Sequence, residues 1–180
     1  MRDVVIASAC RTPIGNFQGT LAKFSAPQLG ALAAAEALRR AGVEPDAVQE
    51  VIFGNVLTAG VGQNPARQVA RAAGVPDHVG SLTINKVCGS GLKAVMLAAQ
   101  AIRAGDAECV LAGGMESMSS APYLVPTARS GARLGHAELI DSMVQDGLWD
   151  VYNDFHMGIT GELVAEKYEI TREEIGRAHV

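Results

Sequence analysis

The chain has 180 residues, a formal net charge of −4 and 48% hydrophobic residues. That length and apolar content suit a folded domain with a sizeable core and exclude an intrinsically disordered chain. The acidic balance argues against nucleic acid as the main partner, and no apolar run reaches the roughly 18 residues that a membrane span needs. The three cysteines lack the spacing of a disulfide framework or a zinc site, so we expect free thiols, no metal and a cytoplasmic location.

The first part of the chain predicts a strand followed by a helix. Residues 4–9 form a short apolar run with β-branched side chains, which is typical of a buried strand. Ser25 and Gln28 have the spacing of a capping box, in which each side chain bonds to the backbone of the other. We therefore expect a helix that begins after Ser25 and ends at Gly42.

The middle of the chain continues this alternation. Strands are predicted at residues 51–53, 81–85 and 109–113, and helices at residues 64–74 and 92–104. Short turns between strands and helices favour crossover connections, so we predict an α/β fold with a mixed, mostly parallel sheet and helices on both faces. The helix at 92–104 is apolar nearly all round, which predicts burial on most sides.

The last third of the chain has a different composition. Residues 117–150 have weak periodicity, and we interpret them as an excursion from the α/β domain because a structureless loop of that length is uncommon. A helix is expected after His156, and Thr171 with Glu174 predicts the start of another. Gly176 is expected to break that second helix.

Cys88 lies between a predicted strand and the apolar helix, beside Gly89 and Gly91. Glycines permit a tight turn, and a helix N-terminus offers free N–H groups and partial positive charge that favour a thiolate and can hold an oxyanion. Acyl transfer requires such a nucleophile beside an electrophilic pocket. At this point two alternatives stay open, a buried structural cysteine and a phosphate-binding turn, although the glycine spacing fits no phosphate loop.

Several segments in the same order carry a family resemblance. The segment NKVCGSGLKA around Cys88 resembles the nucleophile segment of thiolases, the acetyl-CoA acetyltransferase family. The similarity covers residues 1 to about 174. The other segments that resemble thiolases are residues 11–19, 54–56, 63–67, 112–119 and 156–158.

The resemblance implies an activity and a set of site residues. Thiolases condense two acetyl-CoA molecules into acetoacetyl-CoA, and they run the reverse thiolysis with coenzyme A, through an acyl-cysteine. Cys88 would be the acylated residue, and the backbone N–H groups of Cys88 and Gly89 would hold the oxyanion. His156 and Met157 match the segment that borders the pantetheine arm and the acyl pocket. Coenzyme A thioesters would be substrates, with no cofactor and no metal.

The resemblance also implies an assembly and a domain organisation. Residues 124–135, made basic by Arg129 and Arg133, match the loop that joins thiolase dimers into tetramers, so we expect a homotetramer at full length, with no nucleic acid or membrane partner. Residues 1–117 would form the thiolase-like N-terminal domain, and residues 118–174 part of the loop or tetramerisation subdomain. Residues 175–180 depart from the family, and we interpret them as translated adapter DNA.

The family's second half supplies a Gly-His-Pro and a Cys-x-Gly-Gly-Gly segment, and neither occurs in this sequence. We therefore expect that the C-terminal domain is absent and that the chain is inactive alone. The alternatives are a 3-ketoacyl-CoA thiolase of fatty-acid degradation, a ketoacyl synthase and a non-catalytic fragment. Cys10 and Cys109 are expected to pack in the core on strands, while His78 lies in a turn and His136 on a loop surface. Without a covering layer, four residues of the apolar helix should be partly exposed: Val95, Met96, Ala99 and Ile102.

Overall fold

The computed structural model describes residues 3–178 and divides the chain into two compact units, Met1–Pro122 and Tyr123–Val180. Helices and strands alternate in the first unit, with short 3-10 turns at Pro45–Ala47 and Met118–Ser120. Its main elements, in chain order, are α1 (Ala26–Ala41), β1 (Glu50–Gly54), α2 (Pro65–Ala72), β2 (Gly80–Ile84), α3 (Ser90–Ala104) and β3 (Val110–Gly114).

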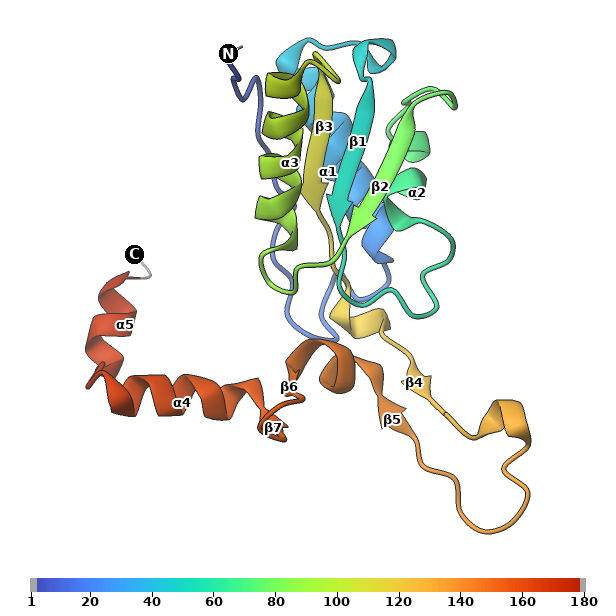
Figure 1. Cartoon of the computed structure of the whole chain (residues 1–180), viewed down its shortest axis with the longest axis vertical. Helices are drawn as coiled ribbons and strands as arrows, with labels where there is room; N and C mark the ends of the chain where they lie inside the picture. The colour runs from blue at the N-terminus through green and yellow to red at the C-terminus, as the bar shows by residue number, and fades with distance from the viewer. Residues whose placement is uncertain (1–2, 179–180) are drawn as a thin grey trace. The chain divides into compact units, whose positions relative to one another are not determined.

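The sheet of the first unit has β1 at its centre. β1 pairs in parallel with β2 on one side and with β3 on the other. The register places Gly54, at the end of β1, beside Ile84 of β2 and Gly114 of β3. α3 packs on one face of the sheet, and α1 and α2 pack on the other (Figure 1). The predicted α/β fold with helices on both faces is thereby confirmed, and the pairs of this sheet in residues 3–178 are all parallel.

Side chains at the helix ends explain where the helices begin and end. The Ser25 N–H donates to Gln28 Oε1 (2.8 Å) and the Gln28 N–H donates to Ser25 Oγ (3.4 Å), which completes the predicted capping box of α1. Gly42 ends α1 with a φ of 63°. At the start of α2, Asn64 Oδ1 accepts from the Arg67 N–H (3.2 Å). Each such cap stabilises its helix by about 1 kcal/mol.

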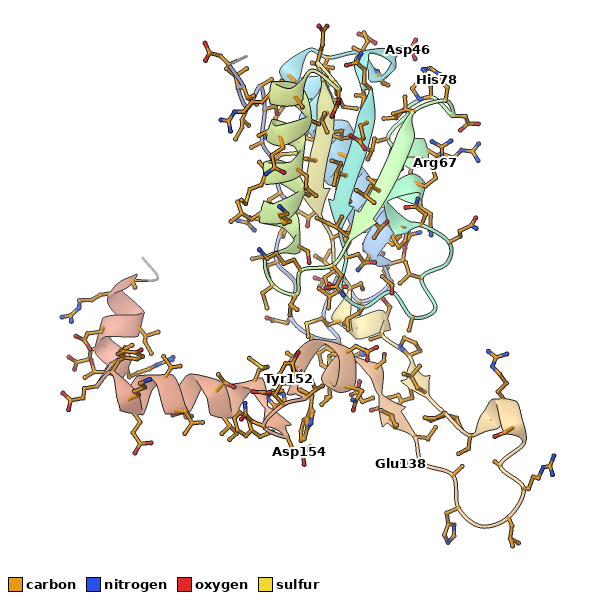
Figure 2. The ribbon with its side chains drawn as sticks, viewed as in Figure 1. Asp46, Arg67, His78, Glu138, Tyr152 and Asp154 are labelled. Carbon is orange, nitrogen blue, oxygen red and sulfur yellow. The ribbon has the colours of Figure 1, made fainter. Side chains whose placement is uncertain are left out.

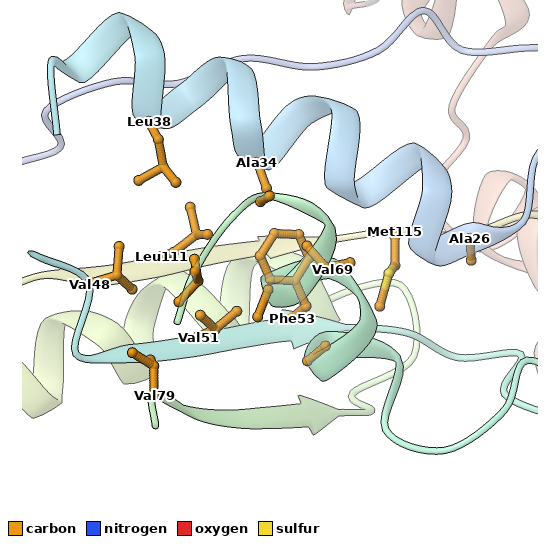
Figure 3. Packing of buried hydrophobic residues seen from close by; sticks show 14 residues of the cluster. Ala26, Ala34, Leu38, Val48, Val51, Phe53, Val69, Val79, Leu111 and Met115 are labelled. Carbon is orange, nitrogen blue, oxygen red and sulfur yellow. The ribbon is translucent and has the colours of Figure 1, made fainter. Parts of the chain in front are cut away.

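The core lies between the sheet and helices α1 and α2 (Figure 3). Successive residues of a strand point to opposite faces, so Val51 and Phe53 both lie on the side of α1 and α2. They pack in one cluster with Leu38 of α1, Val69 of α2 and Leu111 of β3. Full burial of each such side chain contributes about 1.5–3 kcal/mol, so this layer supplies much of the stability of the unit.

The predicted strand at residues 4–9 is wrong. This segment has no regular secondary structure, and Val5 and Ile6 are 80% and 75% exposed. A strand needs a hydrogen-bonding neighbour, and the described sheet consists of β2, β1 and β3 without this segment. The segment contacts α1 at its end, where the Cys10 thiol donates to the Ala33 carbonyl oxygen (2.9 Å).

α3 is covered by the sheet on one side only. Its buried residues are Ser90, Ala94 and Ala98, whereas Leu92 and Met96 are 69% and 48% exposed. The apolar sequence of this helix thus did not lead to burial on most sides, because the described residues place a layer on one face alone. The partial exposure predicted for Val95, Met96, Ala99 and Ile102 is confirmed.

The second unit consists of small antiparallel strand pairs followed by two helices. β4 (Tyr123–Leu124) pairs with β5 (Ile140–Asp141), and β6 (Trp149–Asp150) pairs with β7 (Phe155–His156). A π-helical turn at Val144–Leu148 precedes β6. The helices that follow are α4 (Met157–Lys167) and α5 (Arg172–Ala178).

The turn between β6 and β7 is held by side chains. Asp150 accepts hydrogen bonds from the Asn153 side chain (2.8 Å), the Tyr152 N–H (2.9 Å) and the Asn153 N–H (3.1 Å), and these bonds lower the pKa of Asp150. The Trp149 indole N–H donates to Asp154 Oδ1 (3.2 Å). Tyr152 and Asp154 lie together at this turn (Figure 2).

The last helix corrects a further expectation. Thr171 and Glu174 form the predicted capping box, in which the Thr171 N–H donates to Glu174 Oε2 (2.8 Å) and the Glu174 N–H donates to Thr171 Oγ1 (3.2 Å). These bonds lower the pKa of Glu174. Gly176 does not break α5, which continues to Ala178, because a single glycine costs a helix only about 1 kcal/mol. Within residues 3–178, no helix combines the length and the apolar character needed to cross a membrane.

Candidate active site

Glycines bring the N-terminus of α3 against the ends of two strands. A Cβ atom on Gly54 of β1 would lie 2.5 Å from Ser90 Cβ and 2.8 Å from the Gly91 N atom. A Cβ atom on Gly114 of β3 would lie 3.0 Å from Gly91 Cα. α3 therefore starts in direct contact with the carboxyl ends of β1 and β3, at a distance that only glycine permits. The backbone of Gly91 packs on Gly114.

The turn from β2 into α3 is tightly bonded. Val87 has a φ of 47°, in the left-handed region that a side chain with a branched Cβ rarely adopts. Its N–H donates to Asn85 Oδ1 (2.9 Å). Ser90 Oγ accepts from the Lys86 N–H (2.8 Å) and donates to the Val87 carbonyl oxygen (2.6 Å). This buried hydroxyl thus spans the turn, and Cys88 lies inside the loop that it closes.

Cys88 is exposed at the surface of this turn. The alternative of a buried structural cysteine is therefore wrong. The Gly89 N–H donates to the Lys86 carbonyl oxygen (3.0 Å) and the Ser90 N–H to the Val87 carbonyl oxygen (3.1 Å), while the Cys88 N–H takes no part in these bonds. Cys88 precedes the N-terminus of α3, where the positive end of the helix dipole can stabilise an anionic oxygen bound beside it.

A carboxylate at the same edge of the sheet was not singled out by sequence analysis. Glu116, which follows β3, accepts hydrogen bonds from the Asn55 side chain (2.6 Å) and from the backbone N–H groups of Val56 (2.9 Å) and Leu57 (3.1 Å). Asn55 is 1% exposed, and its Oδ1 atom has no hydrogen-bond partner among residues 3–178. The pair fixes the loop after β1 to the end of β3. The available signal was that both residues follow strands and lie in segments that resemble thiolases, residues 54–56 and 112–119.

The other cysteines and the histidine of the first unit lie in structural positions. Cys109 packs against the core, as expected, and lies just before β3. Cys10 is half-buried on the extended segment rather than on a strand. His78 lies in the turn before β2, on the same side of the unit as Arg67 (Figure 2), whose guanidinium bonds the Val79 carbonyl oxygen (2.6 Å). Residues 3–178 contain no group of three or more acidic, Cys or His side chains placed to bind a metal.

The remaining residues of interest belong to the second unit. His156 caps α4, and its Nδ1 accepts from the Gly158 N–H (3.0 Å). Met157, the first residue of α4, is exposed. His136 lies exposed in the loop between β4 and β5, as expected. The structure therefore unites Cys88 with Gly89 in one turn, while His156 and Met157 form a local group in another unit.

The sequence matches the family model described as "Thiolase, N-terminal domain" over residues 4–178. It is 65% identical over 173 residues to the acetyl-CoA acetyltransferase of Cupriavidus necator. It is 61% identical over 174 residues to the acetyl-CoA acetyltransferase of Pseudomonas aeruginosa. These alignments cover 96% and 97% of this chain but 44% of each relative, so the chain spans less than half the length of these relatives.

A solved structure is similar over most of this chain. The crystal structure of a thiolase from Ascaris suum in complex with coenzyme A matches with a TM-score of 0.91 and 44% sequence identity. The match covers 96% of this chain and 44% of the Ascaris chain.

Proposed function

Because this chain belongs to the thiolase family, we propose that it carries the nucleophile of an acyl transfer between coenzyme A thioesters, with Cys88 as the acylated residue. The observation that carries this proposal is the exposed Cys88 thiol at the tight turn into α3. Two relatives named acetyl-CoA acetyltransferase support acetyl-CoA as the substrate, and the Ascaris complex supports binding of the coenzyme A part of a substrate. No cofactor enters the proposal, in which coenzyme A thioesters are substrates.

The proposed reaction has two steps. In the first, the Cys88 sulfur attacks the carbonyl carbon of acetyl-CoA, a thioester to Cys88 forms, and coenzyme A leaves with the thiol proton. In the second, the α-carbon of another acetyl-CoA loses a proton and attacks the acetyl group on Cys88, which gives acetoacetyl-CoA and restores the thiol. Thiolysis is the reverse. The Cys88 N–H would hold the oxyanion of each step, since the Gly89 N–H is already bonded to Lys86.

We assign a binding role to the second unit. His156 and Met157 would border the pantetheine arm and the acyl group, as the family resemblance implies. Both side chains are exposed, so they are accessible to a substrate. The basic loop with Arg129 and Arg133 would join subunits into a homotetramer, and we propose a cytoplasmic location.

The 180-residue chain should bind acetyl-CoA and react with it at Cys88 without catalytic turnover. Positioned acid–base groups contribute about 10²–10⁴ in rate. The Gly-His-Pro and Cys-x-Gly-Gly-Gly segments that supply these groups in thiolases do not occur in its sequence. A chain that spans 44% of its relatives is therefore expected to accept an acyl group at Cys88 at most slowly. Thiolysis of longer 3-ketoacyl-CoA substrates is the alternative activity within the same chemistry.

A chimera tests the proposed function. Residues 1–174 would be joined to the remainder of the Cupriavidus necator relative, with which this chain shares 65% identity. We expect the chimera to form acetoacetyl-CoA and Cys88→Ser to abolish turnover, because a serine hydroxyl stays protonated where a thiol ionises. Cys10→Ser is the matched control and should retain activity. Full turnover by the Cys88→Ser chimera would contradict the proposal.

A further inference from the structure

We propose that Ser90 is a positioning residue, whose hydroxyl holds Val87 in its left-handed conformation and thereby presents the Cys88 thiol at the N-terminus of α3. The inference rests on the proposed role of Cys88 as nucleophile. It starts from the φ of 47° at Val87, the residue immediately before Cys88. A branched Cβ disfavours that region, so the surrounding contacts must hold the residue there.

The Ser90 hydroxyl has the contacts to do this. It accepts from the Lys86 N–H (2.8 Å) on one side of Val87 and donates to the Val87 carbonyl oxygen (2.6 Å) on the other. Ser90 is 4% exposed, so water does not replace these bonds at low cost. Its Cβ is fixed in turn by the close approach of Gly54, whose own Cβ would lie only 2.5 Å away. The sheet thus orients Ser90, and Ser90 orients the turn.

The direction of Cys88 follows from Val87. A change of φ at one residue rotates all that follows, and Cys88 is the next residue along the chain. If the Ser90 hydroxyl is lost, the backbone bonds from the Gly89 N–H to the Lys86 carbonyl oxygen and from the Ser90 N–H to the Val87 carbonyl oxygen remain. Val87 is then held less firmly and moves toward the region that its side chain prefers, which turns the thiol away from the N-terminus of α3. Asn85, which is exposed, adds a weaker hold through its bond to the Val87 N–H (2.9 Å).

The test measures iodoacetamide alkylation of each thiol in the 180-residue chain by mass spectrometry. We expect Ser90→Ala to slow alkylation of Cys88 about fivefold, in line with the loss of one effective hydrogen bond. The rate at Cys109 should stay unchanged, which shows that the fold persists. Ser120→Ala is the matched control, since Ser120 also donates to the carbonyl three residues earlier (3.0 Å), and it should leave the Cys88 rate unchanged.

A second substitution separates positioning from packing. Glycine adopts positive φ freely, so Val87→Gly in the Ser90→Ala background should restore the Cys88 rate to within about twofold of the original chain. If Ser90→Ala leaves the Cys88 rate unchanged, or if the double variant stays as slow as the single one, the inference is overturned. If the Ser90→Ala variant does not fold, Asn85→Ala is the deciding variant. An alkylation rate of Cys88 that is at least twofold slower supports the proposal that side-chain bonds hold Val87 at positive φ, and an unchanged rate overturns it. Failure of the chimera to turn over would refute the proposed function without altering these rates.

Discussion

Gly54→Ala should loosen the junction on which the candidate site is built. The new Cβ would lie 2.5 Å from Ser90 Cβ, 2.6 Å from the Ser90 carbonyl carbon and 2.8 Å from the Gly91 N atom. Two of these three atoms belong to the backbone, so no rotamer change relieves the overlap, and α3 must move. Overpacking of this kind costs about 1–3 kcal/mol of the free energy of unfolding.

Gly80→Ala is the matched control, because Gly80 is also a strand glycine and a Cβ there would meet nothing within 4 Å. Its effect should be neutral or stabilising by a few tenths of a kcal/mol to about 1 kcal/mol, since alanine restricts the unfolded chain. The assay is urea unfolding monitored by circular dichroism. Midpoints are compared with one common m-value, the dependence of the unfolding free energy on urea concentration. Equal midpoints for the two variants would refute the argument that Gly54 is required for the approach of α3.

Two further predictions concern charge. Hydrogen bonds from Arg39 and then Arg40 lower the pKa of Glu36 to about 2, from an ordinary value of 4.5; the stabilisation by this carboxylate is therefore complete above pH 4.5 and lost as the pH falls toward 2. Glu36→Gln should reduce the loss of unfolding free energy between pH 4.5 and pH 2, as measured by urea unfolding, and an unchanged loss would contradict this reasoning. In the chimera, replacing Arg129 and Arg133 by Glu should convert tetramers into dimers in light scattering, because like charges across an interface are unfavourable; an unchanged tetramer would refute the proposed role of the loop.

Local patterns in the sequence predicted the first unit well. The Ser25 and Gln28 capping box, the glycine that ends α1 and the strand at β1 all depend on residues close in the chain, and the structure has each of them. Cys88 was placed correctly between a strand and a helix for the same reason. Such patterns depend on residues that are close in the sequence and not on contacts across the fold.

Two of the features that the sequence did not reveal depend on distant neighbours. The apolar run at residues 4–9 signals a strand, but a strand also requires a hydrogen-bonded neighbour, and the described sheet consists of β2, β1 and β3 without this segment. The Asn55 and Glu116 pair joins residues 61 positions apart, which no local pattern reveals. The positive φ of Val87 arises from bonds that converge on it from both sides, so its valine side chain gives no hint of it.

Acetyl transfer to Cys88 is the most direct test of the central claim. The chimera would be mixed with acetyl-CoA, quenched within one turnover and digested, and the acetyl group would be located by mass spectrometry. The account predicts a thioester on Cys88 that hydroxylamine removes, formed together with one equivalent of free coenzyme A, and no acetylation of Cys10 or Cys109. An acetyl group distributed equally over the three cysteines, or a chimera that forms acetoacetyl-CoA without acetylated Cys88, would contradict it.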